Sequence, residues 1–408
     1  MPERPLPTEQ QVRALIHDRR NWGRWGKDDQ LGAINLITPA KRAAAARLVR
    51  TGRSVSLSRP FPKEPGLNNA LPAHHYMRTL PRGKGGFAAD YYGIFYHGVA
   101  STHLDALCHT WDEHAMWNGR DPKKEITFDG ATFGSVEHWA EGILTRAVML
   151  DVPRHRGTGS VTEERPVHGW ELEDIARARG LRLEPGDAVC VYSGREAWQA
   201  ANAERPYGRP FGIGPNERPG LHVSCLEFLR DHDVSVLVWD MLDHLPVGYD
   251  IPWAVHAALF AYGVALVDNA LLEPLARACV DERRDEFMLI VAPLVVVAGP
   301  APPRTRSRCS ERQSARYLRS APGASAMPWP GRSGIRKSPW SITGIWAKRS
   351  SGTQSIHSTR KPLLSAPATC SDSSCTTWGE TAIWWAAASR PILRVSLKPL
   401  ARQTSGIR

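Results

Sequence analysis

The chain lacks the features that mark membrane proteins and disulfide-stabilised proteins. Over its 408 residues, no apolar run approaches the roughly 20 residues that a membrane-spanning helix needs. The first 20 residues contain no apolar segment of the kind that a secretory signal carries. The seven cysteines are odd in number and include no CxxC pair, which is typical of reduced thiols rather than of a disulfide framework or a zinc ribbon. We therefore expect a cytoplasmic protein with no membrane partner.

Acidic side chains are scarce in the last quarter of the chain. Residues 301–408 contain 18 Lys and Arg against 3 Asp and Glu, whereas residues 1–300 contain 34 against 38. The formal net charge of +11 therefore belongs to a basic tail attached to a mildly acidic body. A basic segment can bind nucleic acid by displacing counterions from phosphates. Because the body has no excess of positive charge, we expect no nucleic-acid partner.

The body, residues 1–298, has turn and helix-boundary residues at intervals that are typical of a folded α/β chain. Apolar runs bounded by turn residues alternate with segments of helical period, as in a mixed α/β domain. Thr38 and Pro39 form a helix start, and Gly180 and Gly263 each follow a helical segment. The pattern predicts helices over 39–51, 170–179, 225–231, 253–262 and 271–279, and strands over 188–192, 234–239, 264–267 and 287–297.

Residues 299–408 show neither the strand period nor the helix period, and we expect an unstructured tail. Against simple disorder, the tail holds 6 of the 15 Trp, which disordered segments usually lack. Back-translation of Ala298–Glu311 in the shifted frame permits Gly-Gly-Thr-Gly-Ser-Pro-Ala-Asn-Pro-Leu-Ala-Val-Leu, followed by a stop codon. We hypothesise that a frameshift near Val297 makes the tail an out-of-frame translation. Resequencing of codons 290–312 distinguishes this from a genuine disordered tail.

The strongest chemical signal is the segment Tyr96–Trp111, YHGVASTHLDALCHTW. It places His97, His103, Asp105 and His109 within 13 residues. A strand over 94–96 that continued through the segment would put His97, His103 and Asp105 on one face. Imidazole and carboxylate ligands of this kind suit zinc or manganese. The alternative interpretation is an Asp–His pair that fastens a loop.

The HLDALCH motif resembles the HxDAxxH core of the cyclase family, which includes bacterial kynurenine formamidase and isatin hydrolase. NWGRWGKDDQLGAINLIT, PGLHVSCLEFL, IPWAVHAALFAYGVALVDN and FMLIVAPL also resemble one actinobacterial-type branch of that family. The likeness covers nearly all of residues 20–297, and the shifted frame restores the run that follows APL in the family. It implies an α/β fold of the swivelling β/β/α type, with a mixed β core and outer helices. It also implies a homo-oligomer, either a dimer or a tetramer.

The same resemblance implies a metal-dependent hydrolase of a small amide, lactam or ester, with a divalent ion, Zn or Mn, as cofactor. Kynurenine formamidase, an arylformamidase of tryptophan catabolism, is the nearest label for such an activity. The family's metal-site roles fall on His103, Asp105, His256 and Asp268, and the proton-transfer role falls on His109. His256 lies near the end of a predicted helix and Asp268 on the returning strand, so both can face one end of the sheet. Taken alone, His256 is also compatible with a packed helix histidine.

Two positions depart from the family pattern. Val99 stands where the family has its first metal-binding His, four residues before His103. His97 can substitute only if the strand shifts or bulges. Asp268 is shorter than the Glu or Gln that the family uses, and we therefore expect one ion rather than two.

His222, in the PGLH run, is a further candidate for a ligand or a substrate contact, or else a histidine at a helix start. The alternative function is a non-catalytic member of the same fold that binds a small molecule, which the loss of a ligand at Val99 would favour.

Overall fold

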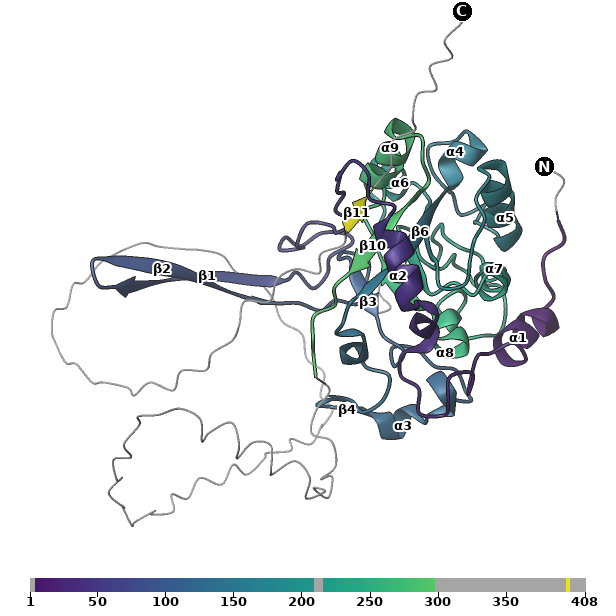
Figure 1. Cartoon of the computed structure of the whole chain (residues 1–408), viewed down its shortest axis with the longest axis horizontal. Coiled ribbons are helices and arrows are strands. Elements are labelled where there is room, and N and C mark those ends of the chain that lie inside the picture. The colour runs from purple at the N-terminus through teal and green to yellow at the C-terminus, as the bar shows by residue number, and fades with distance from the viewer. Residues whose placement is uncertain (1–3, 209–215, 298–393, 397–408) are drawn as a thin grey trace, which may run out of the picture. The chain divides into compact units, whose positions relative to one another are not determined.

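A seven-stranded mixed sheet forms the centre of the described chain. The computed structural model describes residues 4–208, 216–297 and 394–396, which belong to one compact unit. In spatial order, the strands of the sheet are β11 (Arg394–Ser396), β10 (Glu286–Val291), β6 (Ile143–Asp151), β7 (Ala188–Tyr192), β8 (Val236–Trp239), β9 (Ala265–Asp268) and β3 (His103–Asp105) (Figure 1). Strands β6 to β9 are parallel, whereas β3, β10 and β11 run antiparallel to their neighbours.

The remaining elements surround this sheet. Two further pairs of strands are β1 (His74–Arg82) with β2 (Gly85–Gly93), and β4 (Ile126–Thr127) with β5 (Gly130–Ala131). The α-helices are α1 (Glu9–His17), α2 (Pro39–Ala46), α3 (Pro122–Glu125), α4 (Val152–Arg156), α5 (Gly169–Ala178), α6 (Arg195–Ala201), α7 (Cys225–Asp231), α8 (Ala257–Tyr262) and α9 (Glu273–Asp281). Three short 3-10 helices are η1 (Gly32–Leu36), η2 (Trp117–Gly119) and η3 (Val136–Trp139).

The central strands are apolar on both faces because both faces are covered. β7 reads AVCVY and β8 reads VLVW, and every residue of both strands is buried. Such continuous apolar runs are typical of parallel strands inside a sheet. Successive residues of β6 point to opposite sides, so that Val148 and Leu150 join one core while Ala147 and Met149 join the other.

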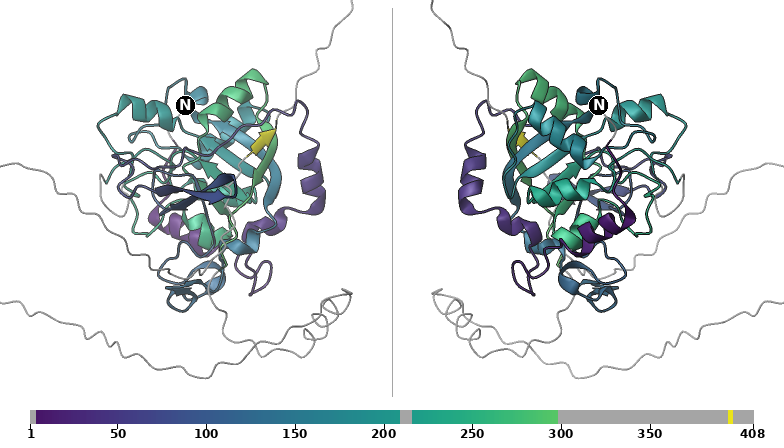
Figure 2. Two further views of the ribbon diagram at one scale, coloured as in Figure 1. Left: turned by 90° about the vertical axis from the view of Figure 1, so that its left-hand side faces the viewer. Right: turned by 90° about the vertical axis from the view of Figure 1, so that its right-hand side faces the viewer.

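Helices cover each face of the sheet (Figure 2). One core gathers side chains from α5, α7 and α8, and the other gathers side chains from α9 and from the segment around η1. Where β8 and β9 end, the parallel strands leave an edge at which polar side chains accumulate. Ligands of open α/β sheets bind at such carboxyl ends of strands.

The structure confirms the predicted α/β fold with a mixed sheet and outer helices. Helix α2 begins at Pro39, with the Thr38 side chain accepting a hydrogen bond from the Lys41 amide. Helix α7 and strand β7 have the predicted bounds. Helices α2 and α8 are shorter than predicted, and β10 ends at Val291, two residues before Pro293. A proline lacks the amide hydrogen that a strand needs, which accounts for that end.

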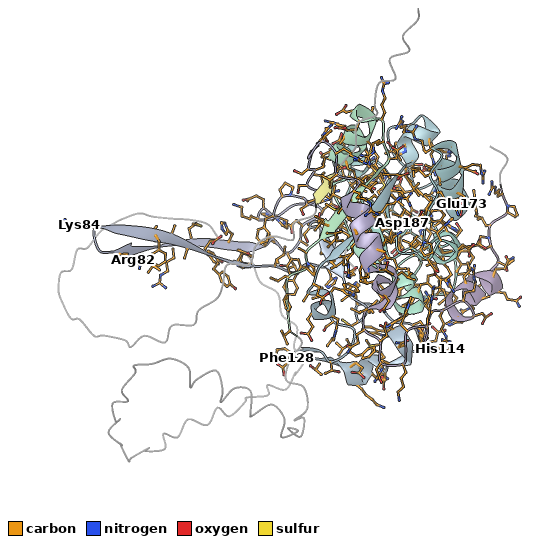
Figure 3. All side chains as sticks on the ribbon, viewed as in Figure 1. Arg82, Lys84, His114, Phe128, Glu173 and Asp187 are labelled. Atoms are coloured by element: carbon orange, nitrogen blue, oxygen red, sulfur yellow. The ribbon has the colours of Figure 1, made fainter. Side chains whose placement is uncertain are left out.

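The sequence patterns missed the arm formed by β1 and β2. These nine-residue strands pair antiparallel along their whole length, and almost all of their side chains are partly or fully exposed. In Figure 3, Arg82 and Lys84 mark the tip of the arm. The strand predicted over 94–96 is wrong, because the backbone after Gly93 is irregular as far as Thr102.

Most of the predicted tail lies outside the described residues, and the hypothesised frameshift near Val297 falls where the second described range ends. Of residues 299–408, the structure describes 394–396, which form β11 at the edge of the sheet beside β10. Among the described helices, none has both the length and the apolarity that a membrane span requires.

Candidate metal centre

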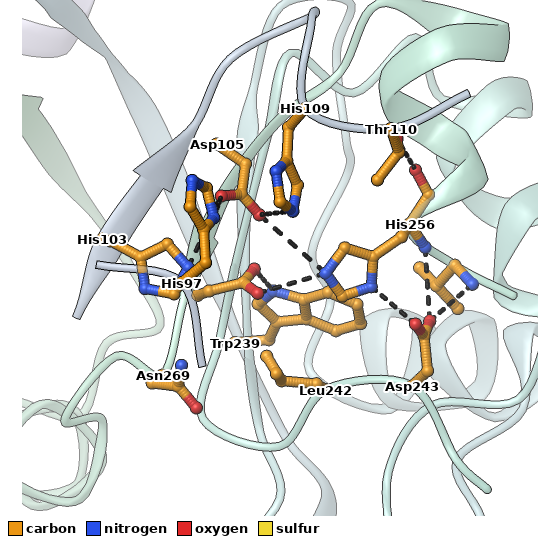
Figure 4. A network of polar contacts seen from close by, with 12 residues as sticks. His97, His103, Asp105, His109, Thr110, Trp239, Leu242, Asp243, His256 and Asn269 are labelled. Carbon is orange, nitrogen blue, oxygen red and sulfur yellow. Dashed lines mark hydrogen bonds and ion pairs between the residues drawn. The ribbon is translucent and has the colours of Figure 1, made fainter. Parts of the chain in front are cut away.

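Two strands bring three of the predicted ligands together at the edge of the sheet. His103 in β3 pairs directly with Asp268 in β9, and Asp105 lies two residues further along β3 (Figure 4). Residues two apart in a strand point to the same face. The backbone pairing therefore places the His103 and Asp105 side chains on one face, next to the end of β9.

Asp105 is the centre of the cluster. Its side chain is fully buried, and neither of its oxygens accepts a hydrogen bond within the described residues. Four imidazoles nevertheless surround it. Oδ1 lies 3.1 Å from His97 Nδ1 and 3.4 Å from His103 Nε2, while Oδ2 lies 3.7 Å from His109 Nε2 and 3.9 Å from His256 Nε2. Burial raises the pKa of Asp105, but His103 and the other nearby histidines lower it by a larger amount, so the net shift of the pKa is downward. Asp105 is therefore a buried carboxylate with open acceptor positions.

His97 reaches Asp105 from a loop and not from a shared strand face. Gly98 has φ of 139°, a backbone conformation that favours glycine, and the chain bends there. The Asn269 side chain donates a hydrogen bond to Gly98 O at 2.8 Å. Arg195 donates one to Val99 O at 2.9 Å. The chain is extended over His103–Asp105 but bends at Gly98, and this bend turns Val99 into the core and leaves His97 facing Asp105.

On the His256 side of the cluster, the side chains of Asp243 and Trp239 form hydrogen bonds with the candidate ligands. His256 Nε2 lies 3.2 Å from Asp268 Oδ2, and Nδ1 lies 2.6 Å from Asp243 Oδ2. Trp239 Nε1 donates to the other oxygen of Asp268 at 2.5 Å. Burial lowers the pKa of His256, but the carboxylates of Asp243 and Asp268 raise it well above the ordinary value. His256 thus presents each ring nitrogen to a buried carboxylate, and Asp243 is placed to orient its ring.

His109 stands beside the cluster rather than within it. Its ring stacks on the ring of His97, with centroids 4.0 Å apart and an interplanar angle of 6°. Burial lowers the pKa of His109 to about 4, although Asp105 opposes the shift. Its side chain is 25% exposed, compared with 0% for Asp105. His109 is therefore a partly exposed histidine beside the carboxylate of Asp105, and its lowered pKa makes it a weaker base than an ordinary histidine.

The donors fall into two overlapping groups that could each hold a metal ion. One consists of His97, His103 and Asp105, and the other of Asp105, His256 and Asp268. Within each group, the ligand atoms lie within 4.8 Å of one another. Asp105 belongs to both groups and has two oxygens without hydrogen bonds, so it is suited to join two ions. Imidazole and carboxylate donors fit a divalent transition metal.

His222 lies apart from this cluster. Its Nδ1 is 3.1 Å from Ser224 Oγ, and its ring is 4.6 Å from the ring of His168. These residues border a separate cavity of about 840 Å³, which also touches Tyr249. Burial lowers the pKa of His222 to about 3. The structure therefore does not bring His222 to the metal-type donors.

The sequence analysis missed the residues that hold the ligands in place. Asp243, Trp239, Asn269 and Arg195 are all buried and contact either a candidate ligand or the loop that carries His97. Asn269 directly follows Asp268 and was quoted within the VALVDN run. For Asp243 and Arg195, the only available signal was a charged residue next to a predicted buried strand.

Comparisons with known proteins give the family resemblance and the fold of this chain. Residues 48–244 match the family model Cyclase, described as "Putative cyclase". A crystal structure described as a novel cyclase has 28% identity and a TM-score of 0.61, over 70% of this chain and 95% of that chain. A search of curated proteins finds no match. The matched stretch contains the HLDALCH motif, and both findings agree with the resemblance to the cyclase family that this motif predicted.

Two further solved structures are more distantly similar. Isatin hydrolase A from Ralstonia solanacearum has 16% identity and a TM-score of 0.40, over 64% of this chain and 92% of that chain. A predicted metal-dependent hydrolase from Bacillus stearothermophilus has 16% identity and a TM-score of 0.35, over 60% of this chain and 93% of that chain. Both likenesses are too distant to indicate what this chain acts on.

Proposed function

We propose that this protein is a metal-dependent hydrolase of a small amide, lactam or ester. The observation that carries the proposal is Asp105, a fully buried carboxylate with no hydrogen bond to either oxygen and with four imidazoles within 4 Å. A buried carboxylate without hydrogen bonds is costly, and a metal ion is the partner that such a donor set fits. His103, Asp105, His256 and Asp268 would hold the metal, with His97 as a further ligand.

The chemistry of the reaction is divided between the metal and the chain. A bound divalent ion polarises a carbonyl and lowers the pKa of water. His109 lies beside Asp105 and is partly exposed, so it is placed to take a proton from the attacking water and to return it to the leaving nitrogen or oxygen. Asp243 orients His256, and Trp239 orients Asp268, through the hydrogen bonds described above. Asp243 and Trp239 therefore position the ligands, and we assign them no part in proton transfer.

An aromatic substrate is favoured by the side chains next to His109. The Trp253 ring lies 6.4 Å from the His109 ring and 5.6 Å from the His256 ring. Its indole nitrogen donates to Trp111 O at 3.0 Å, which fixes the ring at the edge of the site. Aromatic rings bury large apolar areas against flat ligands. Aryl formamides of the N-formylkynurenine type are accordingly the first substrates to test.

Metal content and turnover test the proposal together. Purified full-length protein is loaded with Zn²⁺ or Mn²⁺, analysed for metal per protomer, and assayed on an aryl formamide, an aromatic lactam and an aryl ester. We expect one or two ions per protomer and hydrolysis of at least one class, lost after chelation and restored by metal. A folded protein that binds neither ion would refute the hydrolase and leave the non-catalytic binder.

The role of His109 is tested separately from metal binding. His109→Ala should keep the full metal content and lose about 10²- to 10⁴-fold in kcat, the usual contribution of a positioned acid or base. Cys108→Ser is the matched control, because burial raises the pKa of the adjacent Cys108 thiol to about 11 and keeps it protonated. Full turnover by His109→Ala would remove the proton-transfer role.

A further inference from the structure

A second group of metal-type donors lies away from Asp105 and shares no residue with the central cluster. It consists of His17, Glu113 and His114, whose ligand atoms lie within 4.8 Å of one another. His17 ends helix α1, whereas Glu113 and His114 belong to the segment that follows His109. His114 lies at the surface of the molecule (Figure 3). Two distant parts of the sequence thus contribute donors to one small region.

Asp112 orders this region from beneath. Its Oδ1 accepts hydrogen bonds from the amides of His114 at 2.8 Å and Ala115 at 3.0 Å, which fixes the turn. Its Oδ2 lies 3.7 Å from His17 Nδ1, and its side chain is only 4% exposed. Metal-binding histidines commonly present one ring nitrogen to a carboxylate and the other to the metal. Asp112 is placed to orient His17 in this way and to leave Nε2 for a ligand.

We propose that His17, Glu113 and His114 form a peripheral binding site for Zn²⁺. Two imidazoles and a carboxylate are a donor set that zinc accepts, with solvent completing the coordination. Metal–nitrogen bonds of about 2.1 Å require donors about 3.4 Å apart in tetrahedral geometry. The ligand atoms lie within 4.8 Å of one another, so at most a small rotation of the side chains brings them to that spacing. Glu113 and His114 are 54% and 56% exposed, so their side chains have room to rotate.

Arg13 would compete with a zinc ion for Glu113, but Glu113 is only one of its partners. Arg13 Nη1 lies 3.5 Å from Glu113 Oε1, but Arg13 also pairs with Glu9 at 3.0 Å and with Asp250 at 3.4 Å. Ion pairs between exposed side chains contribute little to stability. Loss of one such pair is therefore a small cost against coordination of a divalent ion.

The position of this site gives the ion a structural role. Thr110 Oγ1 donates to His256 O at 3.3 Å, and Trp253 donates to Trp111 O, so the segment after His109 already contacts the central cluster. An ion on His17 and His114 would fasten the far end of the same segment to helix α1. Zinc at this peripheral site would thereby restrict the motion of the segment that follows His109.

Zinc stoichiometry of the full chain tests the site. Wild-type protein and a His17→Gln/His114→Gln variant are dialysed against stepped concentrations of free Zn²⁺ and analysed for metal. We expect the wild type to bind one more ion per protomer than the variant. Because the test is a difference between two proteins, it holds whether or not the central cluster binds metal. Equal stoichiometry and equal affinity would overturn the proposal.

Two single variants guard against a folding defect. Glu113→Gln changes an exposed side chain and should weaken the additional ion by at least about tenfold, with an unchanged circular dichroism spectrum. His138→Gln is the matched control. His138 Nε2 lies 4.0 Å from the preceding Glu137 Oε1, much as His114 Nε2 lies 3.9 Å from the preceding Glu113 Oε1. Unlike Glu113 and His114, however, Glu137 and His138 belong to no metal-type group of the described chain. Unchanged zinc binding in Glu113→Gln, or a loss in His138→Gln, would refute the assignment.

Discussion

The two sides of the central cluster are built differently. His256 and Asp268 are buried, and each has a further side chain bonded to it, Asp243 and Trp239 respectively. His97 is 54% exposed and depends on a loop that is held through its backbone carbonyls at Gly98 and Val99. One side of the site is therefore positioned by side chains from regular elements, and the other by a bent loop.

This difference indicates which ligands are set in advance. A ligand with an orienting hydrogen bond keeps its geometry without the metal, whereas an exposed ligand on a loop must be ordered on binding. We therefore expect the group Asp105, His256 and Asp268 to bind more tightly than the group His97, His103 and Asp105. The following variants test that order, from the largest expected effect on metal binding to none.

Asp105→Asn should have the largest effect because Asp105 belongs to both groups. Loss of its charge should weaken metal binding by more than about 100-fold at either position, beyond what the loss of an outer partner costs. Elemental analysis after dialysis measures this. Asp187→Asn is the matched control, since Asp187 is also fully buried but pairs with Lys41 and Arg146, both at 2.7 Å. It should lower stability and leave the metal content unchanged.

Asp243→Asn should weaken the more tightly bound ion by about 10- to 100-fold, the usual cost of removing a carboxylate behind a metal-binding histidine. The amide can still accept the backbone hydrogen bonds of Val255 and His256, so the fold should persist. Competition with a chelator of known affinity gives the dissociation constant. An unchanged constant would mean that Asp243 does not orient His256.

His97→Gln should remove at most one ion and leave the ion at His256 with its original affinity. The reason is that His97 belongs to only one of the two groups. Isothermal titration with Zn²⁺ resolves the two affinities. His74→Gln, on the exposed arm, is the control. If His97→Gln abolished all binding, the loop side would be the dominant one, and the comparison above would be reversed.

Val99→His should not create a further ligand. Val99 is 4% exposed and packs in the core, where its Cγ1 would lie 2.7 Å from a Cβ added at Gly208. Burying an imidazole there should lower the free energy of unfolding by about 1–3 kcal/mol. Urea denaturation and metal analysis measure the two effects. An increase in bound metal would show that position 99 can face Asp105 after all.

The spacing within HLDALCH pointed to His103 and Asp105 as a pair of donors on one face of a strand. The family resemblance supplied His256 and Asp268, and their separation of twelve residues across a helix end and a returning strand is compatible with the contact that the structure shows. The fold class followed from the alternation of apolar runs such as AVCVY and VLVW with helical segments.

The loop side could not be predicted from periodicity. The bend at Gly98 requires a positive φ that no strand pattern reports. The side chains that bond to this loop, Arg195 and Asn269, come from elements far along the chain, so their contacts depend on tertiary packing. The place of His222 depends in the same way on where Ser224 and His168 pack, and it lies away from the metal-type donors, just before helix α7.

The pairing of β3 with β9 also dictates when the site can exist. His103 lies opposite Asp268 in that ladder, and the four parallel strands must be in order before β3 has an edge on which to add. Contacts between residues so distant in sequence form slowly, because a long loop must close first. During synthesis, His103 and Asp105 in β3 therefore reach their final positions only after most of the body has been synthesised. Metal capture is accordingly a late event, which completes a scaffold already folded, whereas a zinc finger needs its ion in order to fold at all.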